Sequence, residues 1–357
     1  MALVEDGHAA RWWHREGERI VCTLCPRYCT LSEGQAGFCY IRRRVGDQLV
    51  SLGYGRTTGF AVDPVEKKPL NHFLPGTPTL SFGTAGCNLG CKFCQNWDIS
   101  KARLAEEKSS EVSPARVVEL AEEHGCPSLS MTYNDPIIWA EFAIDVAKAA
   151  RQRGLRSILV TAGYVTAEAR AELFADIDAT NVDLKAFTED FYEKVTFSQL
   201  APVLETLQWI KRETKVWLEI TNLMIPGLND DPRETDRLVE WVGAELGDET
   251  PLHFTAFHPD WKMLDRPPTP PATLVEARRR ARAAGLKYVY TGNVHDPDGQ
   301  TTFCPNCQMC VIRRDRYAVS PEGLKDGACG RCGTRIAGVF STAQASPGRR
   351  RHLGLIS

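Results

Sequence analysis

The chain has 357 residues, of which 43% are hydrophobic and 25% charged, so it can bury a large core and is not of a disordered type. Its 43 Lys and Arg residues are balanced by 45 Asp and Glu residues, which gives no support for a globally basic nucleic-acid-binding protein. There is no apolar run of about 18 residues, and the N-terminus lacks a basic head followed by an apolar stretch. We therefore expect a cytoplasmic protein without a membrane span. Its 13 cysteines, an odd number, are expected to be reduced and to bind metals rather than form disulfides.

The first predicted part is a cysteine-rich segment over residues 1–77. Four thiols lie close together in its sequence: Cys22, Cys25, Cys29 and Cys39. Four cysteines at such spacings are typical ligands of a bound metal. The pattern leaves two interpretations open, a zinc site or an auxiliary iron–sulfur cluster that relays electrons or contacts substrate.

The second predicted part, residues 78–300, alternates short apolar runs with helical patterns. The runs predict strands over 79–83, 128–132, 157–161, 181–184, 216–221, 253–257 and 288–291. The helical patterns cover 113–125, 137–153, 166–174, 199–212, 232–246 and 271–284. This order predicts an α/β fold with parallel strands, namely a partial (β/α)6 barrel of the TIM type, with a doubly wound sheet as the rival. In such a barrel the functional side chains lie at the C-terminal ends of the strands.

The most specific motif follows the first of these strands and reads Cys87-x3-Cys91-x2-Cys94. Three thiolates on one short loop can bind three irons of a [4Fe–4S] cube and leave the fourth iron without a protein ligand. An open metal position distinguishes a reactive site from a structural one. The alternatives are a zinc site with a distant fourth ligand and a set of buried thiols.

The motif, with Phe93 directly before the third cysteine, resembles the signature of the radical S-adenosylmethionine (SAM) superfamily. The resemblance implies that Cys87, Cys91 and Cys94 hold a [4Fe–4S] cluster whose open iron binds SAM, and that one electron then cleaves SAM to methionine and a hydrogen-abstracting 5′-deoxyadenosyl radical. Several further stretches resemble the enzymes of the AmmeMemoRadiSam system, which are related to glycyl-radical-enzyme activating enzymes. They are 95–100, 132–136, 181–187, 225–230, 257–260 and 288–294.

Other side chains at the predicted strand ends are candidates for cofactor binding. The set is Phe93, Asn134, Asp135, Gly163, Asp183 and Lys185. The resemblance implies that Phe93 lies near the adenine of SAM. It also implies that Asp135 occupies the position at which relatives have a Glu that binds the SAM amino group. The alternative for Asp135 is a turn residue, because Asp is common before proline in turns. Asp183 and Lys185 alternate along one strand and share a face, so they either bind SAM or substrate or form a structural ion pair. His258 and Asp260 are weaker candidates.

The third predicted part, residues 301–342, carries two Cys-x2-Cys pairs around a hairpin-like stretch. The four thiols are Cys304, Cys307, Cys329 and Cys332. The arrangement predicts a zinc ribbon, with iron in a rubredoxin-like site as the alternative. Cys126 and Cys310 remain without a ligand role, and we expect residues 343–357 to form a disordered tail.

These features predict a radical SAM enzyme that abstracts hydrogen from an unidentified substrate. One alternative is a glycyl-radical-enzyme activase, and another is an inactive, metal-stabilised binding scaffold. The expected cofactors are a [4Fe–4S] cluster, SAM and zinc. The expected partners are an electron donor of the flavodoxin or ferredoxin type and either a protein substrate or Memo-like and Ammecr1-like proteins, with no membrane or nucleic acid.

Overall fold

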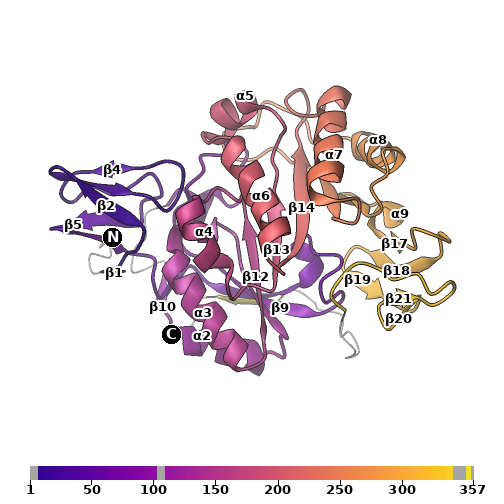
Figure 1. The fold of residues 1–357 in the computed structure, drawn as a ribbon, viewed down its shortest axis with the longest axis horizontal. Helices are drawn as coiled ribbons and strands as arrows, with labels where there is room; N and C mark the ends of the chain where they lie inside the picture. Colours follow the sequence, from indigo (N-terminus) through magenta and orange to yellow (C-terminus); the bar gives the residue numbers. More distant parts are fainter. Residues whose placement is uncertain (1–6, 103–108, 341–350, 355–357) are drawn as a thin grey trace.

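The computed structural model describes residues 7–102, 109–340 and 351–354. Its centre is a sheet with the strand order β16-β15-β14-β13-β12-β11-β9-β8-β22 (Figure 1). Within this sheet, the strands from β9 to β16 are parallel, and each pairs with the strand next to it in this order. Their bounds are β9 (Pro78–Phe82), β11 (Ser128–Met131), β12 (Arg156–Thr161), β13 (Ala179–Asp183), β14 (Trp217–Met224), β15 (Leu252–Ala256) and β16 (Val289–Gly292). Since the strand order never reverses within this set, the doubly wound alternative is wrong.

Long helices connect successive parallel strands and cover one side of the sheet (Figure 1). They are α2 (Pro114–Glu123), α3 (Ala140–Gln152), α4 (Ala167–Phe174), α6 (Ala201–Glu213), α7 (Pro232–Leu246) and α8 (Pro271–Ala283). The start of α2 follows from its sequence, because Ser113 accepts a hydrogen bond from the backbone N–H of Arg116 and Pro114 occupies the first helical position. Shorter turns are η1 (Val65–Lys67), α1 (Trp97–Ser100), η3 (Pro136–Trp139), α5 (Glu189–Phe191), the π-helix η4 (Tyr192–Thr196) and α9 (Pro297–Gln300).

The barrel is open between its two edge strands. β16 forms one edge of the sheet, and at the other side β8 (Phe60–Pro64) and β22 (Arg351–Gly354) add to β9 in antiparallel pairing. The prediction of a partial (β/α)6 barrel is therefore confirmed. The strand β22 differs from the expected disordered tail, whereas residues 343–350 and 355–357 of that tail lie outside the described residues.

The N-terminal segment forms two small sheets beside α4 (Figure 1). One contains β2 (Trp13–Glu16), β3 (Arg19–Cys22) and β4 (Thr30–Leu31), and the other contains β1 (His8–Ala9), β6 (Gln48–Ser51) and β5 (Arg42–Val45). A further pair joins β7 (Arg56–Thr57) to β10 (Ser110–Glu111). Ile20 and Ile41 are fully buried and belong to the same apolar core as the barrel, so the segment packs as part of the barrel wall.

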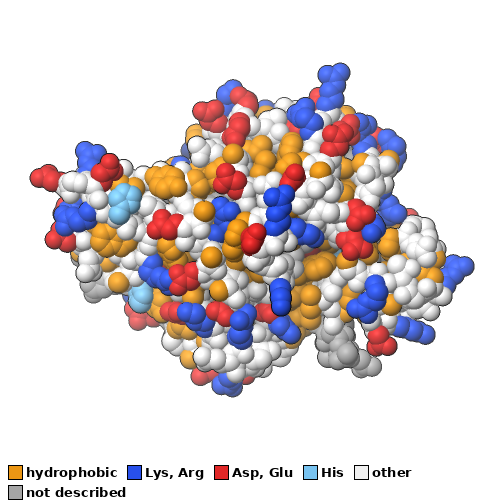
Figure 2. Space-filling view, in the orientation of Figure 1, with side chains coloured by type: hydrophobic (Ala, Val, Ile, Leu, Met, Phe, Trp, Pro, Cys, Tyr) orange, Lys and Arg blue, Asp and Glu red, His pale blue; other side chains and the backbone are white. Residues whose placement is uncertain are grey.

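The C-terminal ribbon lies at the opposite end of the molecule, beyond α8 and α9 (Figure 1). It contains β17 (Thr302–Phe303), β18 (Cys310–Asp315), β19 (Ala318–Ser320), β20 (Leu324–Lys325) and β21 (Ala328–Cys329). Val311, Ile312 and Ile336 form a small core with Tyr288 and Tyr290 of the barrel. Figure 2 shows acidic and basic side chains interspersed over the visible face. None of the helices in the described parts is both long and apolar enough to cross a membrane.

Candidate active site and metal centres

The loop with Cys87, Cys91 and Cys94 runs from the C-terminal end of β9 to α1. Its backbone is held from both sides, because Gly86 N–H donates to Ile99 O over 3.0 Å and Gly90 N–H donates to Thr196 O over 2.8 Å. Gly86 has φ of +88°, and a Cβ there would lie 2.0 Å from the carbonyl oxygen of Cys39. Glycine is therefore required where this loop passes against the N-terminal segment.

The three thiols of this loop are partly or fully buried and lie further apart than ligands of one metal ion. Burial raises the pKa of Cys91 to about 12. Among the described residues, the four cysteines of the C-terminal ribbon are the group of ligand atoms within 4.8 Å of one another, and the loop thiols do not form such a group. Three partly or fully buried thiols on one loop are nevertheless the donor type that a [4Fe–4S] cube requires. Leu89 N–H also points at Cys87 Sγ over 3.5 Å, a contact that suits a charged thiolate.

Asn134 and Asp135 follow the C-terminal end of β11, and their side chains hydrogen-bond to neighbouring backbone groups. The Asn134 amide accepts from Thr84 N–H over 3.2 Å and donates to Gly86 O over 2.8 Å. The Asp135 carboxylate accepts from Thr161 Oγ1 over 2.8 Å and from backbone N–H groups at 137 and 162. Burial raises the pKa of Asp135 to about 6 in spite of these bonds. Both side chains thus position the cluster loop and its neighbouring strand end, and binding of SAM by them stays a prediction.

Asp183 is the last residue of β13, and it forms an ion pair of 2.9 Å with Lys185 just after the strand. Burial works to lower the pKa of Lys185, but the Asp183 carboxylate and the nearby Cys91 raise it above its ordinary value. The Lys185 ammonium lies 5.7 Å from the centre of the Phe93 ring, directly behind the cluster loop. Gly163, with φ of +67°, has no room for a larger residue, because a Cβ would lie 3.0 Å from Val182. Of the predicted site residues, Asn134 therefore contacts the loop through Gly86 and Lys185 contacts it through Phe93.

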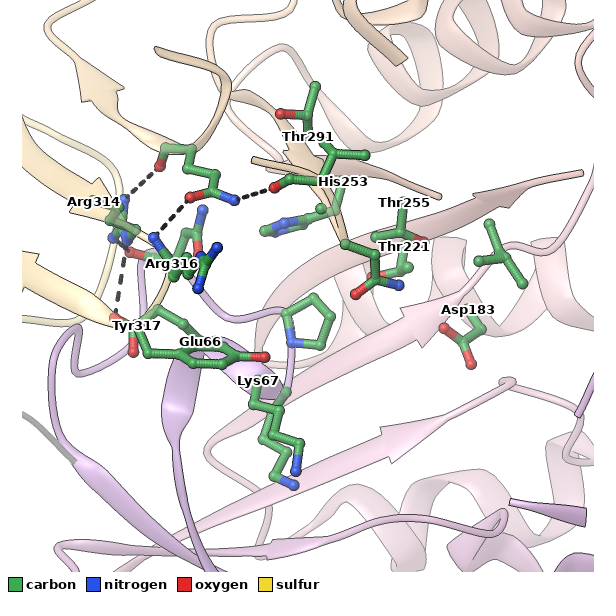
Figure 3. Close-up of a pocket in the computed structure, with 18 of the residues that line it drawn as sticks. Glu66, Lys67, Asp183, Thr221, His253, Thr255, Thr291, Arg314, Arg316 and Tyr317 are labelled. Atoms are coloured by element: carbon green, nitrogen blue, oxygen red, sulfur yellow. Dashed lines mark hydrogen bonds and ion pairs between the residues drawn. The ribbon is translucent and has the colours of Figure 1, made fainter. Parts of the chain in front are cut away.

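A cavity of about 820 Å³ opens at the C-terminal ends of the parallel strands. Gln95 and Asn96, directly after the third cysteine, form its wall on the side of the cluster loop. Asp183, Thr221 and His253 line the barrel side, as Figure 3 shows. Other lining residues come from two elements that the sequence did not associate with the site: Glu66, Lys67, Lys68, Asn71, Arg314, Arg316 and Tyr317. The cavity is therefore enclosed by the barrel, the segment before it and the C-terminal ribbon.

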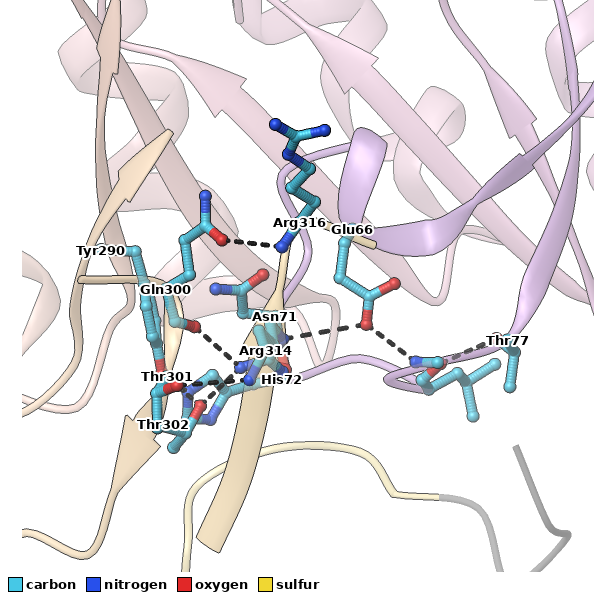
Figure 4. A network of polar contacts seen from close by, with 12 residues as sticks. Glu66, Asn71, His72, Thr77, Tyr290, Gln300, Thr301, Thr302, Arg314 and Arg316 are labelled. Atoms are coloured by element: carbon cyan, nitrogen blue, oxygen red, sulfur yellow. Dashed lines mark hydrogen bonds and ion pairs between the residues drawn. The ribbon is translucent and has the colours of Figure 1, made fainter. Parts of the chain in front are cut away.

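A buried polar network fastens the ribbon to the barrel behind this cavity (Figure 4). Arg314 of β18 is 2% exposed, donates to Thr302 Oγ1 over 2.8 Å and to Asn71 O, and has Glu66 at 3.9 Å. His72 contacts Ala337 O and the Tyr290 hydroxyl. These long-range contacts make the ribbon a fixed part of the cavity wall, which the sequence alone did not indicate.

A second buried carboxylate, Glu219 of β14, lies under the cavity floor. It accepts hydrogen bonds from the backbone N–H groups of Asn71 and His72 and from the side chains of Trp217 and His253, all at 2.7–2.9 Å. Burial works to raise the pKa of Glu219, but these bonds, that of His253 first, hold it below its ordinary value. The segment before the barrel is thereby tied to the centre of the sheet.

The C-terminal thiols form a compact four-ligand group, as predicted. Cys304 and Cys332 Sγ are 3.6 Å apart, and so are Cys307 and Cys329 Sγ. A tetrahedral zinc ion with about 2.3 Å to each sulfur sets sulfurs about 3.8 Å apart, so the group matches one ion. The hydroxyl of Thr334 lowers the pKa of Cys332 to about 6, which favours the thiolate. Which metal binds here stays a prediction.

The predicted weaker candidates have structural contacts. Asp260 accepts from Trp97 Nε1 over 3.2 Å and so holds the helix after the cluster loop. The His258 ring contacts only the neighbouring Pro259 O among the described residues. Cys126 is buried in the barrel core, and Cys310 lies outside the four-ligand group of the ribbon.

Three cysteines on the loop after the first strand of an open parallel barrel lie where such a barrel carries its functional side chains, and thiols of this kind are ligands of iron–sulfur clusters. The sequence pattern of the radical SAM superfamily matches residues 82–239. An uncharacterized protein of Methanocaldococcus jannaschii is 41% identical over 323 residues, which are 90% of this chain and 96% of that protein. The pyruvate formate-lyase 1-activating enzyme of Escherichia coli is 25% identical over 192 residues, covering 52% of this chain and 75% of the enzyme. A radical SAM methyltransferase from Sphaerobacter thermophilus aligns with a TM-score of 0.49 and 15% identity, over 61% of this chain and 67% of that one.

The chain belongs to the radical SAM superfamily. Membership implies a [4Fe–4S] cluster and SAM, and the three partly or fully buried thiols of Cys87, Cys91 and Cys94 on one loop are suitable ligands for that cluster. Cys87, Cys91 and Cys94 would hold this cluster, which would supply one-electron chemistry toward SAM. The residues of this chain hold the cluster loop, through Gly86, Gly90 and Asn134, and enclose the cavity beside it.

Proposed function

We propose that this chain cleaves SAM reductively at a [4Fe–4S] cluster on Cys87, Cys91 and Cys94 and abstracts a hydrogen atom from a substrate in the adjoining cavity. One observation carries the proposal. The loop that carries the three thiols continues into Gln95 and Asn96, which are themselves part of the cavity wall. A reactive group formed at the open iron therefore arises next to a space large enough for a substrate.

The lining of the cavity supports a negatively charged substrate. Lys67 and Lys68 both pair with the buried Asp63, and Arg314 is held in the network described above. By contrast, the guanidinium of Arg316 has no hydrogen bond or ion pair with another described residue and points toward the cavity (Figure 3). A planar guanidinium without a partner is suited to bind a carboxylate or phosphate in two-pronged fashion.

The substrate class is tested by the rate of 5′-deoxyadenosine formation. A true substrate accelerates this reaction in many cofactor enzymes because its binding completes the site. Sets of anionic and neutral metabolites are added to the wild type, to Arg316→Ala and to a matched surface variant, Arg331→Ala. We expect anionic compounds to stimulate the wild type and Arg331→Ala, but not Arg316→Ala. Stimulation by neutral compounds alone, equal in all three proteins, contradicts the inferred charge.

Two alternatives are separated from this function by direct measurements. An inactive scaffold is expected not to bind SAM, so equilibrium dialysis of the reconstituted protein with SAM distinguishes it. A glycyl-radical-enzyme activase produces a persistent protein radical, which electron paramagnetic resonance detects. The similarity to activating enzymes supports a protein substrate. We also propose that the chain is an enzyme of the AmmeMemoRadiSam system. Its partners would then be Memo-like or Ammecr1-like proteins and an electron donor of the flavodoxin or ferredoxin type.

A further inference from the structure

The four cysteines of the N-terminal segment enclose a single cavity. Cys22 ends β3, Cys25 and Cys29 lie on the following loop, and Cys39 lies before β5. The backbone holds them in place, because Cys22 N–H donates to Cys29 O over 3.0 Å. All four line the same small cavity, together with Arg27, Arg42 and Asn88. The structure thus brings together the four thiols that the sequence grouped as ligands of one metal centre.

The size of this cavity distinguishes between the two kinds of metal centre. Four sulfurs around one zinc ion are about 3.8 Å apart and leave no room for a water molecule between them. The C-terminal group meets that condition, with 3.6 Å between paired sulfurs. Among the described residues, the N-terminal thiols do not form a group of ligand atoms within 4.8 Å of one another. The cavity that they line has a volume of about 10 Å³, which is about the space that one water molecule needs. That space is too wide for a single ion bonded to all four sulfurs and suits a larger centre.

A buried cation at the cavity wall suits an anionic centre. The Arg42 side chain is 2% exposed and forms an ion pair with Glu141 at 2.9 Å. Its Nε–H, however, has no hydrogen-bond partner among the described residues, although the side chain lines the cavity. A buried N–H group without a partner is costly, and the sulfides of an iron–sulfur cluster are acceptors for such groups. The charge of Arg42 also offsets part of the negative charge that four thiolates bring.

The cavity is in contact with the loop that holds the reactive cluster. Asn88, which lies between the first two cysteines of that loop, is also part of the wall of the N-terminal cavity. The Arg27 guanidinium donates to Asn88 O from the other side, and Cys39 O packs against Gly86. The N-terminal segment therefore contacts the loop of the reactive cluster directly, at Gly86 and Asn88.

We propose that Cys22, Cys25, Cys29 and Cys39 bind a second [4Fe–4S] cluster, fully ligated by protein, beside the reactive one. The width of the cavity, the unpartnered N–H of Arg42 and the closed set of four thiols carry this assignment. Binding of this cluster does not depend on the function proposed for Cys87, Cys91 and Cys94.

The test uses the full chain with the reactive site removed, as Cys87→Ala/Cys91→Ala/Cys94→Ala, reconstituted anaerobically with iron and sulfide. This variant is expected to retain about four irons and four sulfides per chain and a [4Fe–4S] signal in Mössbauer spectra. In the same background, Cys29→Ser is expected to lose most of that iron, whereas Cys126→Ser, a buried cysteine outside the site, retains it. Circular dichroism verifies that each variant is folded.

Loss of all cluster iron in the triple variant, with its fold and its C-terminal metal intact, overturns the proposal. Zinc in place of iron at the N-terminal site after reconstitution overturns it as well. Neither readout requires SAM cleavage, so failure of this inference and failure of the proposed function are distinguishable.

Discussion

His72 provides a quantitative test of how the ribbon is fastened to the barrel. The ring is fully buried, with Nδ1 at 2.5 Å from Ala337 O and Nε2 at 2.5 Å from the Tyr290 hydroxyl. A carbonyl only accepts, so Nδ1 carries the proton, and Nε2 of the neutral ring accepts from Tyr290. Burial lowers the pKa of His72 to about 4, with Arg314 and His253 acting in the same direction and Glu219 opposing them.

The consequence is a loss of stability as the pH falls. An unfolded histidine has a pKa of about 6.5, so below this value the unfolded chain binds more protons than the folded one. Between pH 7.5 and 5.0, a folded pKa of about 4 corresponds to a loss of about 2 kcal/mol in the free energy of unfolding. His72→Asn keeps a donor toward Ala337 O but does not titrate in this range. The stability difference between wild type and variant is therefore expected to shrink by about 2 kcal/mol at pH 5.0.

The assay is urea unfolding under anaerobic conditions at both pH values, with matched metal content in all proteins. The linkage of metal ligands to pH is then common to wild type and variant and cancels in the difference. His14→Asn, at an exposed position of β2, is the control and is expected to follow the wild type at both pH values. A wild-type-to-His72→Asn difference that stays constant or grows toward pH 5.0 would refute the assignment of a neutral, buried His72.

Three further substitutions test the metal-binding loops. Gly86→Ala places a Cβ against Cys39 O at φ of +88°, so it is expected to lower the free energy of unfolding by about 3 kcal/mol and to lower the iron content of the reactive site. The control Gly125→Ala, at a positive φ with open space around it, is expected to lower the free energy of unfolding by about 1 kcal/mol. Urea unfolding and iron analysis compare the two variants. Asn134→Ala removes both hydrogen bonds to the reactive loop and is expected to destabilise by about 2 kcal/mol with lower cluster occupancy, which unchanged iron content would contradict. Cys332→Ser is expected to lose about one metal ion per chain from the ribbon while the cluster iron is retained, as measured by elemental analysis.

The barrel was predictable because its signals are local. Parallel strands buried on both faces give short, continuous apolar runs, and Ser113 and Pro114 mark the start of α2 in the sequence itself. The reactive loop was predictable for the same reason, since its three thiols lie within eight consecutive positions, 87–94.

The remaining features depend on contacts between distant parts of the chain. Arg314 lies in a short strand, and a local sequence pattern predicts that such a charged side chain is exposed to solvent. In the structure it is buried and donates a hydrogen bond to Asn71 O, 243 positions away in the sequence. The strand β22 lacks an apolar run because it pairs along the edge of the sheet. For Asp183 and Lys185 the sequence left binding and ion pairing as alternatives. The structure shows the ion pair and also places Asp183 in the cavity wall, and binding of SAM or substrate by these residues stays a prediction.

The central claim is tested most directly by incubating the anaerobically reconstituted, dithionite-reduced protein with SAM. We predict 5′-deoxyadenosine and methionine in equal amounts from the wild type and from Cys126→Ser, and none from Cys91→Ser. A protein that carries a complete cluster on Cys87, Cys91 and Cys94 and still forms no 5′-deoxyadenosine contradicts the account.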